Sequence, residues 1–223
     1  MSLNRRNVLG AFAVAGTGLL GPRPKPLVAA LATASSAPAS SVPASSVPAA
    51  PTAARPLLFA RAVAALDRHS ARISDRSVIG VVDFSAPSHA TRLHIVDVAS
   101  GKILAQHLVA HGHGSDPDNS GWVERFSNRP GSNASSAGAF LAADLYTGEH
   151  GRSRRLIGLD PENSLAFERA IVIHAASYVD PMMARTRNRI GRSQGCFAVS
   201  SQAIGEVLAR LGPGRLLYAG KLA

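Results

Sequence analysis

Several kinds of residue are scarce in this sequence, and each scarcity excludes a class of protein. Among 223 residues there is one cysteine, aromatic residues make up 5% and charged residues 17%. One cysteine excludes an intrachain disulfide framework, and no apolar run reaches the roughly 20 residues that a membrane-spanning helix needs. Hydrophobic residues nevertheless account for 46% of the chain, so we expect one domain with a real core, plus appended segments.

The positive charge is concentrated outside the expected domain. The formal net charge is +10, yet residues 1–56 carry five basic residues and no acidic one, whereas residues 77–223 carry 15 Lys and Arg against 12 Asp and Glu. A nucleic-acid-binding domain needs a basic surface of its own. With an excess of only +3 and few aromatic residues, the domain is predicted to have no nucleic-acid partner.

Residues 1–32 have the pattern of an export signal. Arg5 and Arg6 precede a weakly hydrophobic, glycine-containing stretch over residues 8–20, and Ala30-Leu31-Ala32 offers a small-residue cleavage site. Paired arginines in this position are typical of twin-arginine signals. We expect export to the periplasm or cell envelope. A cytoplasmic protein with a basic arm is the alternative, and an uncleaved signal could tether the domain to a membrane.

A linker and a short helix are predicted to follow. Residues 33–56 are rich in Pro, Ala and Ser and contain a five-residue repeat over 39–48, a composition that forms no packed core and predicts disorder. Residues 57–76 place apolar side chains at near-helical spacing and predict a short helix leading into the domain of residues 77–223.

Strand patterns dominate residues 77–223. Residues 78–84 are β-branched and apolar, and residues 93–98 and 103–110 flank the turn signal Ser100-Gly101-Lys102, which predicts a hairpin. Further strands are predicted at residues 139–145, 155–159, 170–174 and 215–219, with one helix at residues 200–211. The predicted fold class is mainly β, a sandwich or barrel-like sheet with one or two short helices.

Cys196 is the candidate nucleophile. It lies in the polar, glycine-containing loop Gly191–Phe197, and an unpaired thiol in an oxidising compartment is a chemical liability. Arginines at positions 185, 187, 189 and 192 predict a positive field that favours the thiolate. An inert cysteine is the alternative interpretation.

His174 is the candidate base, at the end of the strand predicted for residues 170–174. A neighbouring imidazole can take the proton of a thiol and give a thiolate–imidazolium pair. Gly195 permits a tight turn, and the backbone N–H groups of Gly195 and Cys196 are predicted to face a developing oxyanion. The pattern indicates acyl transfer through a thioester, which needs no metal or other cofactor.

A strand-terminal histidine followed by Ser193-Gln194-Gly195-Cys196 resembles the L,D-transpeptidase catalytic domain of peptidoglycan metabolism, in its divergent murein branch. The resemblance covers roughly residues 90–220 and includes blocks at residues 109–115, 126–132, 146–151 and 171–174. It implies an L,D-transpeptidase-like β-sandwich or barrel. It also implies that Cys196 is the nucleophile, that His174 is its base, and that Ser193 and Gly195 shape the loop. The candidate substrate-binding residues are Gln194, Arg192, His111, Ser127, Asn128, Tyr146 and His150. For the last five of these, a structural hydrogen bond within a loop is the alternative.

The resemblance implies a particular reaction. Cys196 would attack the carbonyl at the L-centre of the third residue of a peptidoglycan stem tetrapeptide and expel the terminal D-Ala. An acceptor amine would then form a 3-3 cross-link, whereas water or a free D-amino acid would give carboxypeptidase or exchange activity; the sequence leaves these open, as it does the oligomeric state. Family members are typically acylated by carbapenems, and we expect the same here.

Two departures from the commoner family pattern keep other functions open. Gln194 stands where that pattern has a loop histidine, and Ala198 where it has an arginine, which leaves substrate-carboxylate recognition unassigned among Arg192, Arg189 and Arg129. One alternative is therefore a peptidoglycan-binding module without turnover. A less favoured one is a zinc-dependent hydrolase using His111 and His113, although no closed set of ligand spacings accompanies that pair.

Overall fold

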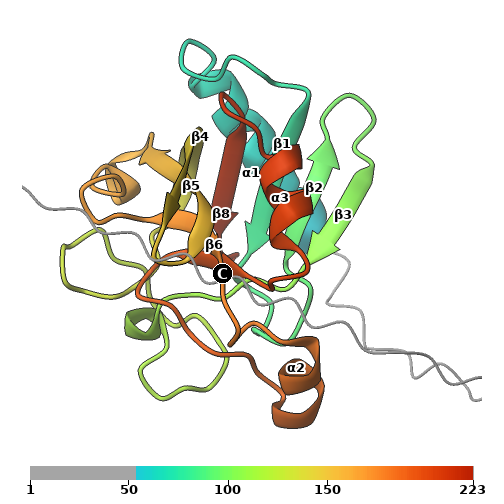
Figure 1. Cartoon of the computed structure of the whole chain (residues 1–223). Helices are drawn as coiled ribbons and strands as arrows, with labels where there is room; N and C mark the ends of the chain where they lie inside the picture. Colours follow the sequence, from blue (N-terminus) through green and yellow to red (C-terminus); the bar gives the residue numbers. More distant parts are fainter. Residues whose placement is uncertain (1–53, 223) are drawn as a thin grey trace, which may run out of the picture. The chain divides into compact units, whose positions relative to one another are not determined.

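The computed structural model describes residues 54–222, with side chains from residue 56. The predicted export signal, residues 1–32, and nearly all of the predicted linker, residues 33–56, lie outside the described residues. Within them the chain forms three α-helices and eight β-strands (Figure 1). The prediction of a mainly β fold is confirmed.

The eight strands form a single hydrogen-bonded sheet in the order β3-β2-β1-β8-β4-β5-β6-β7. Two neighbouring pairs, β1 with β8 and β6 with β7, are parallel, and the other neighbours are antiparallel. The strands are β1 (Val78–Asp83), β2 (Leu93–Asp97), β3 (Ile103–His107), β4 (Gly138–Gly148), β5 (Gly151–Gly158), β6 (Val172–Ala175), β7 (Phe197–Val199) and β8 (Leu216–Gly220). All but β7 fall on segments predicted as strands.

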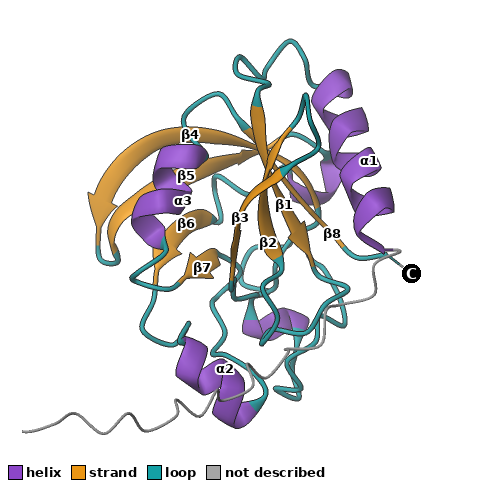
Figure 2. Cartoon of the chain, turned by 90° about the vertical axis from the view of Figure 1, so that its right-hand side faces the viewer, coloured by secondary structure: helices purple, strands orange, loops and turns teal. Residues whose placement is uncertain are grey.

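Helices α1 (Ala54–Arg68) and α3 (Ile204–Arg210) cover opposite faces of the sheet (Figure 2). Successive side chains of a strand point to opposite faces, and β1 follows this rule. Val81 packs in the cluster that contains Leu58 of α1, whereas Val82 packs in the cluster that contains Val207 of α3. Because of this alternation, the central strand β1 contributes side chains to the hydrophobic clusters on both faces of the sheet.

Helix α2 (Pro181–Arg187) was not predicted from the sequence. The side chain of Asp180 accepts a hydrogen bond from the Met182 N–H at 2.6 Å, Pro181 occupies the first turn, and Asn188 ends the helix with a φ of 53°. Only Ala184 is buried, so the helix has no apolar stripe for a periodicity argument to detect. It lies in the long connection between β6 and β7, away from the sheet (Figure 1).

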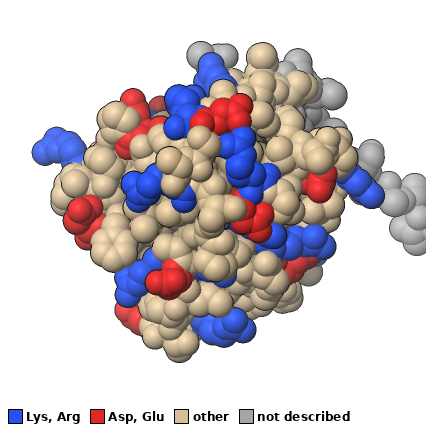
Figure 3. Space-filling model, turned by 90° about the horizontal axis from the view of Figure 1, so that it is seen from above, with Lys and Arg blue, Asp and Glu red and all other residues tan. Residues whose placement is uncertain are grey.

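Charges of both signs are interspersed on the face shown in Figure 3, where Lys and Arg lie among Asp and Glu. No helix among residues 54–222 combines the length and the apolar character needed to cross a membrane.

Candidate active site

The parallel pairing of β6 with β7 brings the candidate nucleophile and base together. Ile173 pairs with Phe197 and His174 with Ala198, and Cys196 immediately precedes β7. The side chains of His174 and Cys196 both line one cavity of about 710 Å³. Two segments that are well separated in sequence therefore deliver a thiol and an imidazole to the same space.

His174, the candidate base, is held in its neutral form. Its side chain is buried, and its Nδ1–H donates a hydrogen bond to the Ala175 carbonyl at 2.9 Å. That tautomer leaves Nε2 with a lone pair that can accept a proton. Burial lowers the pKa of His174 below its ordinary value and nearby His150 lowers it further, while the Ala175 carbonyl opposes them. The imidazole is therefore uncharged near neutral pH.

Cys196 is a protonated thiol at rest. Burial raises its pKa above the ordinary value, and a hydrogen bond from the backbone of Val172 and the charge of Arg169 offset only part of that increase. The Cys196 Sγ lies 3.5 Å from the Ala170 carbonyl, to which its S–H donates. The prediction that arginines 185–192 supply the positive field is wrong, since the cation that acts on this thiol is Arg169.

The loop before Cys196 is fixed by the Ser193 hydroxyl. This group donates to the Cys196 carbonyl at 2.7 Å and accepts from the Gly195 N–H at 3.1 Å. Gly195 has a φ of +116°, and a Cβ there would lie 2.8 Å from the Ala134 carbonyl oxygen, so only glycine fits. The Gly195 N–H does not face an oxyanion site as predicted, because it is already bonded to Ser193.

Segment 111–113 supports the same loop from the other side. The Ser193 N–H donates to the His111 carbonyl at 2.8 Å, and the His113 N–H donates to the Ser193 carbonyl at 2.9 Å. A Cβ on Gly112 would lie 2.2 Å from the Asn133 carbonyl oxygen and 2.7 Å from the Gly195 nitrogen. The backbones pack so closely that the position of the loop that carries Cys196 depends on residues 111–113.

His111 is a structural residue, which corrects its prediction as a substrate contact. Its side chain is fully buried and does not line the cavity. Nδ1 accepts from Arg92 Nη2 at 2.6 Å, and Nε2–H donates to Asp116 Oδ2 at 3.2 Å. Burial and the Arg92 charge lower the pKa of His111 to about 4. Because both ring nitrogens are engaged, His111 also has no nitrogen to offer to a zinc ion.

Of the other predicted substrate-binding residues, Gln194, Arg192 and His150 line the cavity. His150 lies at the turn between β4 and β5, and its ring stacks on that of His174 with 4.3 Å between centroids and 23° between planes. The Arg192 guanidinium donates to the Asp116 carbonyl. The turn between β4 and β5 thus brings the His150 ring into contact with His174.

Three predicted substrate contacts, Ser127, Asn128 and Tyr146, do not line this cavity. The Asn128 amide group donates to Pro161 and Ser164, at 3.0 Å each, and its oxygen accepts from the Leu165 N–H at 3.1 Å. Tyr146 instead packs under the Arg155 guanidinium, 4.3 Å from the ring centroid. Ser127 accepts from the Arg129 N–H at 3.2 Å. Asn128 thus links two loops, Tyr146 packs between the paired strands β4 and β5, and Ser127 makes a local bond within its own loop.

Sequence reasoning missed Arg169, Glu168 and Tyr178, which all line the cavity. Burial raises the pKa of Tyr178 to about 12, and the charge of an ionised Cys196 adds to this. None of the three stands in a recognisable motif. Only their position around the strand that carries His174 could have drawn attention to them.

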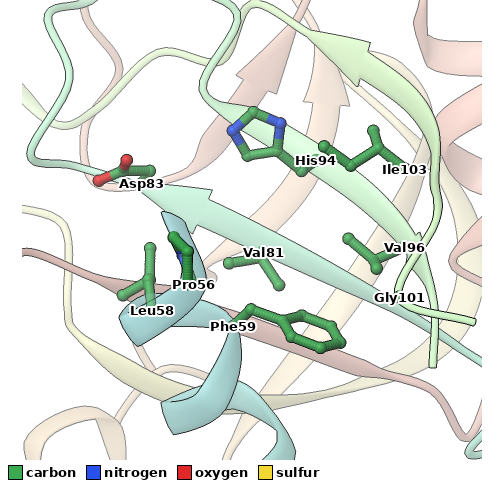
Figure 4. A pocket seen from close by; sticks show the side chains of 9 residues that line it. All are labelled: Pro56, Leu58, Phe59, Val81, Asp83, His94, Val96, Gly101 and Ile103. Atoms are coloured by element: carbon green, nitrogen blue, oxygen red, sulfur yellow. The ribbon is translucent and has the colours of Figure 1, made fainter. Parts of the chain in front are cut away.

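A second pocket, of about 280 Å³, lies between α1 and the first strands of the sheet (Figure 4). Its walls are mostly apolar, and no cysteine is among its lining residues, so it lacks the thiol chemistry of the larger cavity. The lining residues are Pro56, Leu58, Phe59, Val81, Asp83, His94, Val96, Gly101 and Ile103.

Comparison with known proteins places the chain in a family. The family model of the L,D-transpeptidase catalytic domain matches residues 52–219. No curated protein matches the chain.

Several solved structures are similar to the chain. An L,D-transpeptidase from Mycobacterium smegmatis is 13% identical, with 65% of this chain and 58% of that chain covered and a TM-score of 0.40. An L,D-transpeptidase from Xylanimonas cellulosilytica is 14% identical, with 66% and 62% covered and a TM-score of 0.39. L,D-transpeptidase 3 from Mycobacterium tuberculosis, in complex with a faropenem-derived adduct, is 11% identical, with 64% and 60% covered and a TM-score of 0.40.

This chain thus covers less than two thirds of the length of each of these structures. The assignment rests on the family model, which spans three quarters of the sequence. The chain belongs to the L,D-transpeptidase catalytic domain family.

Proposed function

We propose that the protein is a cysteine acyltransferase that acts on peptidoglycan stem peptides through a thioester on Cys196. One observation carries the proposal: Cys196 and His174, brought together by the parallel strands β6 and β7, line the same cavity of about 710 Å³. Membership of the L,D-transpeptidase family supplies the substrate class.

The first half-reaction forms the thioester. His174 Nε2 takes the proton from the Cys196 sulfur, and the thiolate attacks the carbonyl carbon at the L-centre of the third stem residue. The carbon–nitrogen bond to the terminal D-Ala breaks, and its amine leaves with the proton held by His174. The S–H must first turn away from the Ala170 carbonyl, to which it donates in the resting state.

The second half-reaction releases the acyl group. An acceptor amine loses a proton to His174 and attacks the thioester carbonyl, the carbon–sulfur bond breaks, and the thiol is restored by the proton on the imidazolium. An amine from another stem gives a 3-3 cross-link, whereas water gives a trimmed tripeptide. The pKa of His174, lowered by burial, keeps the base in the accepting form at each turn of the cycle.

The cavity lining suits a peptide that carries both carboxylates and amines. Arg169 and Arg192 bring positive charge to it, and Glu149 and Glu168 bring negative charge. We further propose that the domain works outside the cytoplasm, where stem peptides are found, after export directed by residues 1–32. Detection of the protein, with or without residues 1–32, in the periplasmic or envelope fraction tests this part separately, as does its loss from that fraction when Arg5 and Arg6 are changed to Lys.

Intact-protein mass spectrometry tests the chemistry. The full chain, reduced at Cys196, is incubated with a disaccharide-tetrapeptide and, separately, with a carbapenem, beside the Cys196→Ala and His174→Gln variants. We expect a tripeptide or drug adduct that is absent in Cys196→Ala. In His174→Gln it should form slower by about 10²- to 10⁴-fold, the usual contribution of a general base.

Two outcomes contradict the proposal. An adduct of equal yield in Cys196→Ala would place the nucleophile elsewhere. Neither adduct nor turnover, in wild-type protein shown to be folded and reduced, would favour a peptidoglycan-binding module without catalysis. Circular dichroism of each variant controls for folding.

A further inference from the structure

Arg169 makes four hydrogen bonds to one segment of chain, all of them to uncharged acceptors. Nη1 donates to the Ser127 carbonyl at 2.7 Å and to the Ser136 hydroxyl at 2.6 Å. Nη2 donates to the Ser132 hydroxyl at 3.3 Å and to the Ala134 carbonyl at 2.5 Å. Residues 127–136 are thereby wrapped around a single guanidinium.

The same guanidinium lies directly against the loop that carries the nucleophile. A Cβ built on Gly195 would lie 3.3 Å from Arg169 Nη2 and 2.8 Å from the Ala134 oxygen that Nη2 holds. Arg169 and Cys196 line the same cavity. The charge is therefore next to the residue that precedes Cys196 and open to the space in which the thiol reacts.

No carboxylate neutralises this charge. Across residues 56–222, every ion pair within 4.0 Å involves other cations. A half-buried guanidinium without a counter-ion loses hydration that its neutral partners replace only in part. Burial accordingly lowers the pKa of Arg169, and an ionised Cys196 is the one charge that raises it again. The two groups stabilise each other's charged forms.

We propose that Arg169 is a positioning residue for Cys196: its guanidinium holds residues 127–136 against the loop at residues 193–196 and supplies the positive charge beside which the thiolate forms. The proposal rests on the proposed function in taking Cys196 as the nucleophile. Its effect is on the first step, because a stabilised thiolate makes proton transfer to His174 less unfavourable.

The test measures the ionisation of the Cys196 thiol rather than the rate of turnover. Cys196 is the only cysteine of the chain, so the rate of alkylation of the full chain by iodoacetamide, followed by mass as a function of pH, gives the ionisation of this thiol alone. An opposite charge at close range typically lowers the pKa of an acid by about one unit or more. In Arg169→Gln we expect the midpoint of the profile to rise by about one pH unit, so alkylation at pH 7 falls by about tenfold.

Three further variants separate charge from structure. Arg169→Lys keeps the charge and should bring the midpoint back toward that of wild type. Ser136→Ala removes two hydrogen bonds, the one its hydroxyl accepts from Arg169 and the one it donates to the Ser127 carbonyl, but no charge. It should leave the midpoint in place even if it lowers the melting temperature. Arg192→Gln removes a cation from the same cavity that does not contribute to the pKa shift of Cys196, and it should also leave the midpoint unchanged.

An unchanged midpoint in folded Arg169→Gln would overturn the proposal, as would an equal rise in Ser136→Ala or Arg192→Gln. If Arg169→Gln does not fold, the Lys variant decides: it keeps the charge, so a midpoint raised by a full unit in folded Arg169→Lys would overturn the proposal that this charge favours the thiolate. These results are independent of turnover. Wild-type protein that forms no acyl adduct contradicts the proposed function, whereas an unshifted alkylation profile contradicts only the role of Arg169.

Discussion

Replacing His111 by glutamine removes a titratable group from a fully buried position. In the folded protein the imidazole lies between the Arg92 guanidinium and the Asp116 carboxylate. Its pKa there is about 4, against an ordinary value of 6.5, because burial and the Arg92 charge both disfavour the imidazolium. The folded state therefore keeps His111 neutral at pH values where the unfolded chain protonates it.

The direction of the pH effect follows from that difference. Between pH 6.5 and pH 4 the unfolded state binds a proton that the folded state does not, so the free energy of unfolding falls as the pH falls through this window. The stabilisation that comes from keeping His111 neutral is present in full above pH 6.5 and is lost by about pH 4. A gap of roughly 2.5 pH units, at 1.36 kcal/mol for each, makes the loss about 3 kcal/mol.

The glutamine variant should have a lower free energy of unfolding than wild type at pH 7.5, and this difference should shrink as the solution is acidified. At pH 7.5 we expect a cost of about 2 kcal/mol, because the buried partners Arg92 and Asp116 lose good hydrogen bonds. The variant lacks the group that titrates between pH 6.5 and 4. Wild type should therefore lose its advantage near pH 5, and the order of stability should reverse by about pH 4.

Urea denaturation of the full chain, followed by far-ultraviolet circular dichroism at pH 7.5, 6.0, 5.0 and 4.5, measures this difference. His89→Gln is the matched control, because it removes a histidine whose Nδ1 bonds to the Asn188 carbonyl at 2.9 Å, outside the Arg92 network. A gap between His111→Gln and wild type that stays constant with pH would refute the reasoning. It would mean that burial does not hold the imidazole neutral.

Two further substitutions probe the geometry around the thiol. Gly195→Ala should lower the free energy of unfolding by about 1–3 kcal/mol, because of the φ of +116° and the close Ala134 carbonyl. It should also slow alkylation of Cys196. Thermal unfolding and alkylation rates measure the two effects, and an unchanged melting temperature would contradict the prediction. His150→Ala should raise the pKa of His174 toward its ordinary value, since the ring that both buries it and lowers its pKa is gone. The acid limb of the acylation profile should then move to higher pH, and a limb that stays in place would show that the stacking does not tune the base.

The chemistry of the site was more predictable than its supporting structure. A thiol in a polar glycine loop and a histidine at the end of an apolar strand are local signals, and the cavity contains both residues. Strand β7 gave no such signal, because three residues are too few to show alternation and its pairing with β6 depends on a distant part of the chain.

The errors share a physical origin. For His111 the sequence leaves substrate contact and a structural hydrogen bond in a glycine-rich loop equally open, and the Arg92 partner that decides between them lies just before β2. The positive field on Cys196 was assigned to the arginines nearest in sequence, whereas Arg169 acts from the segment before β6. Proximity in sequence says little about which charged residues act on a group, because electrostatic interactions depend on distance through space.

The register between β6 and β7 sets the spacing of two neighbouring strands independently of most of the chain that connects them. The parallel ladder sets the spacing of the strands that adjoin His174 and Cys196, and Ser193 with residues 111–113 holds the loop that leads into Cys196. Residues 177–192, with α2 and its exposed Met182, leave the sheet after the base and return before the thiol. The length of most of that excursion could therefore be changed by design while the ladder keeps the spacing of β6 and β7.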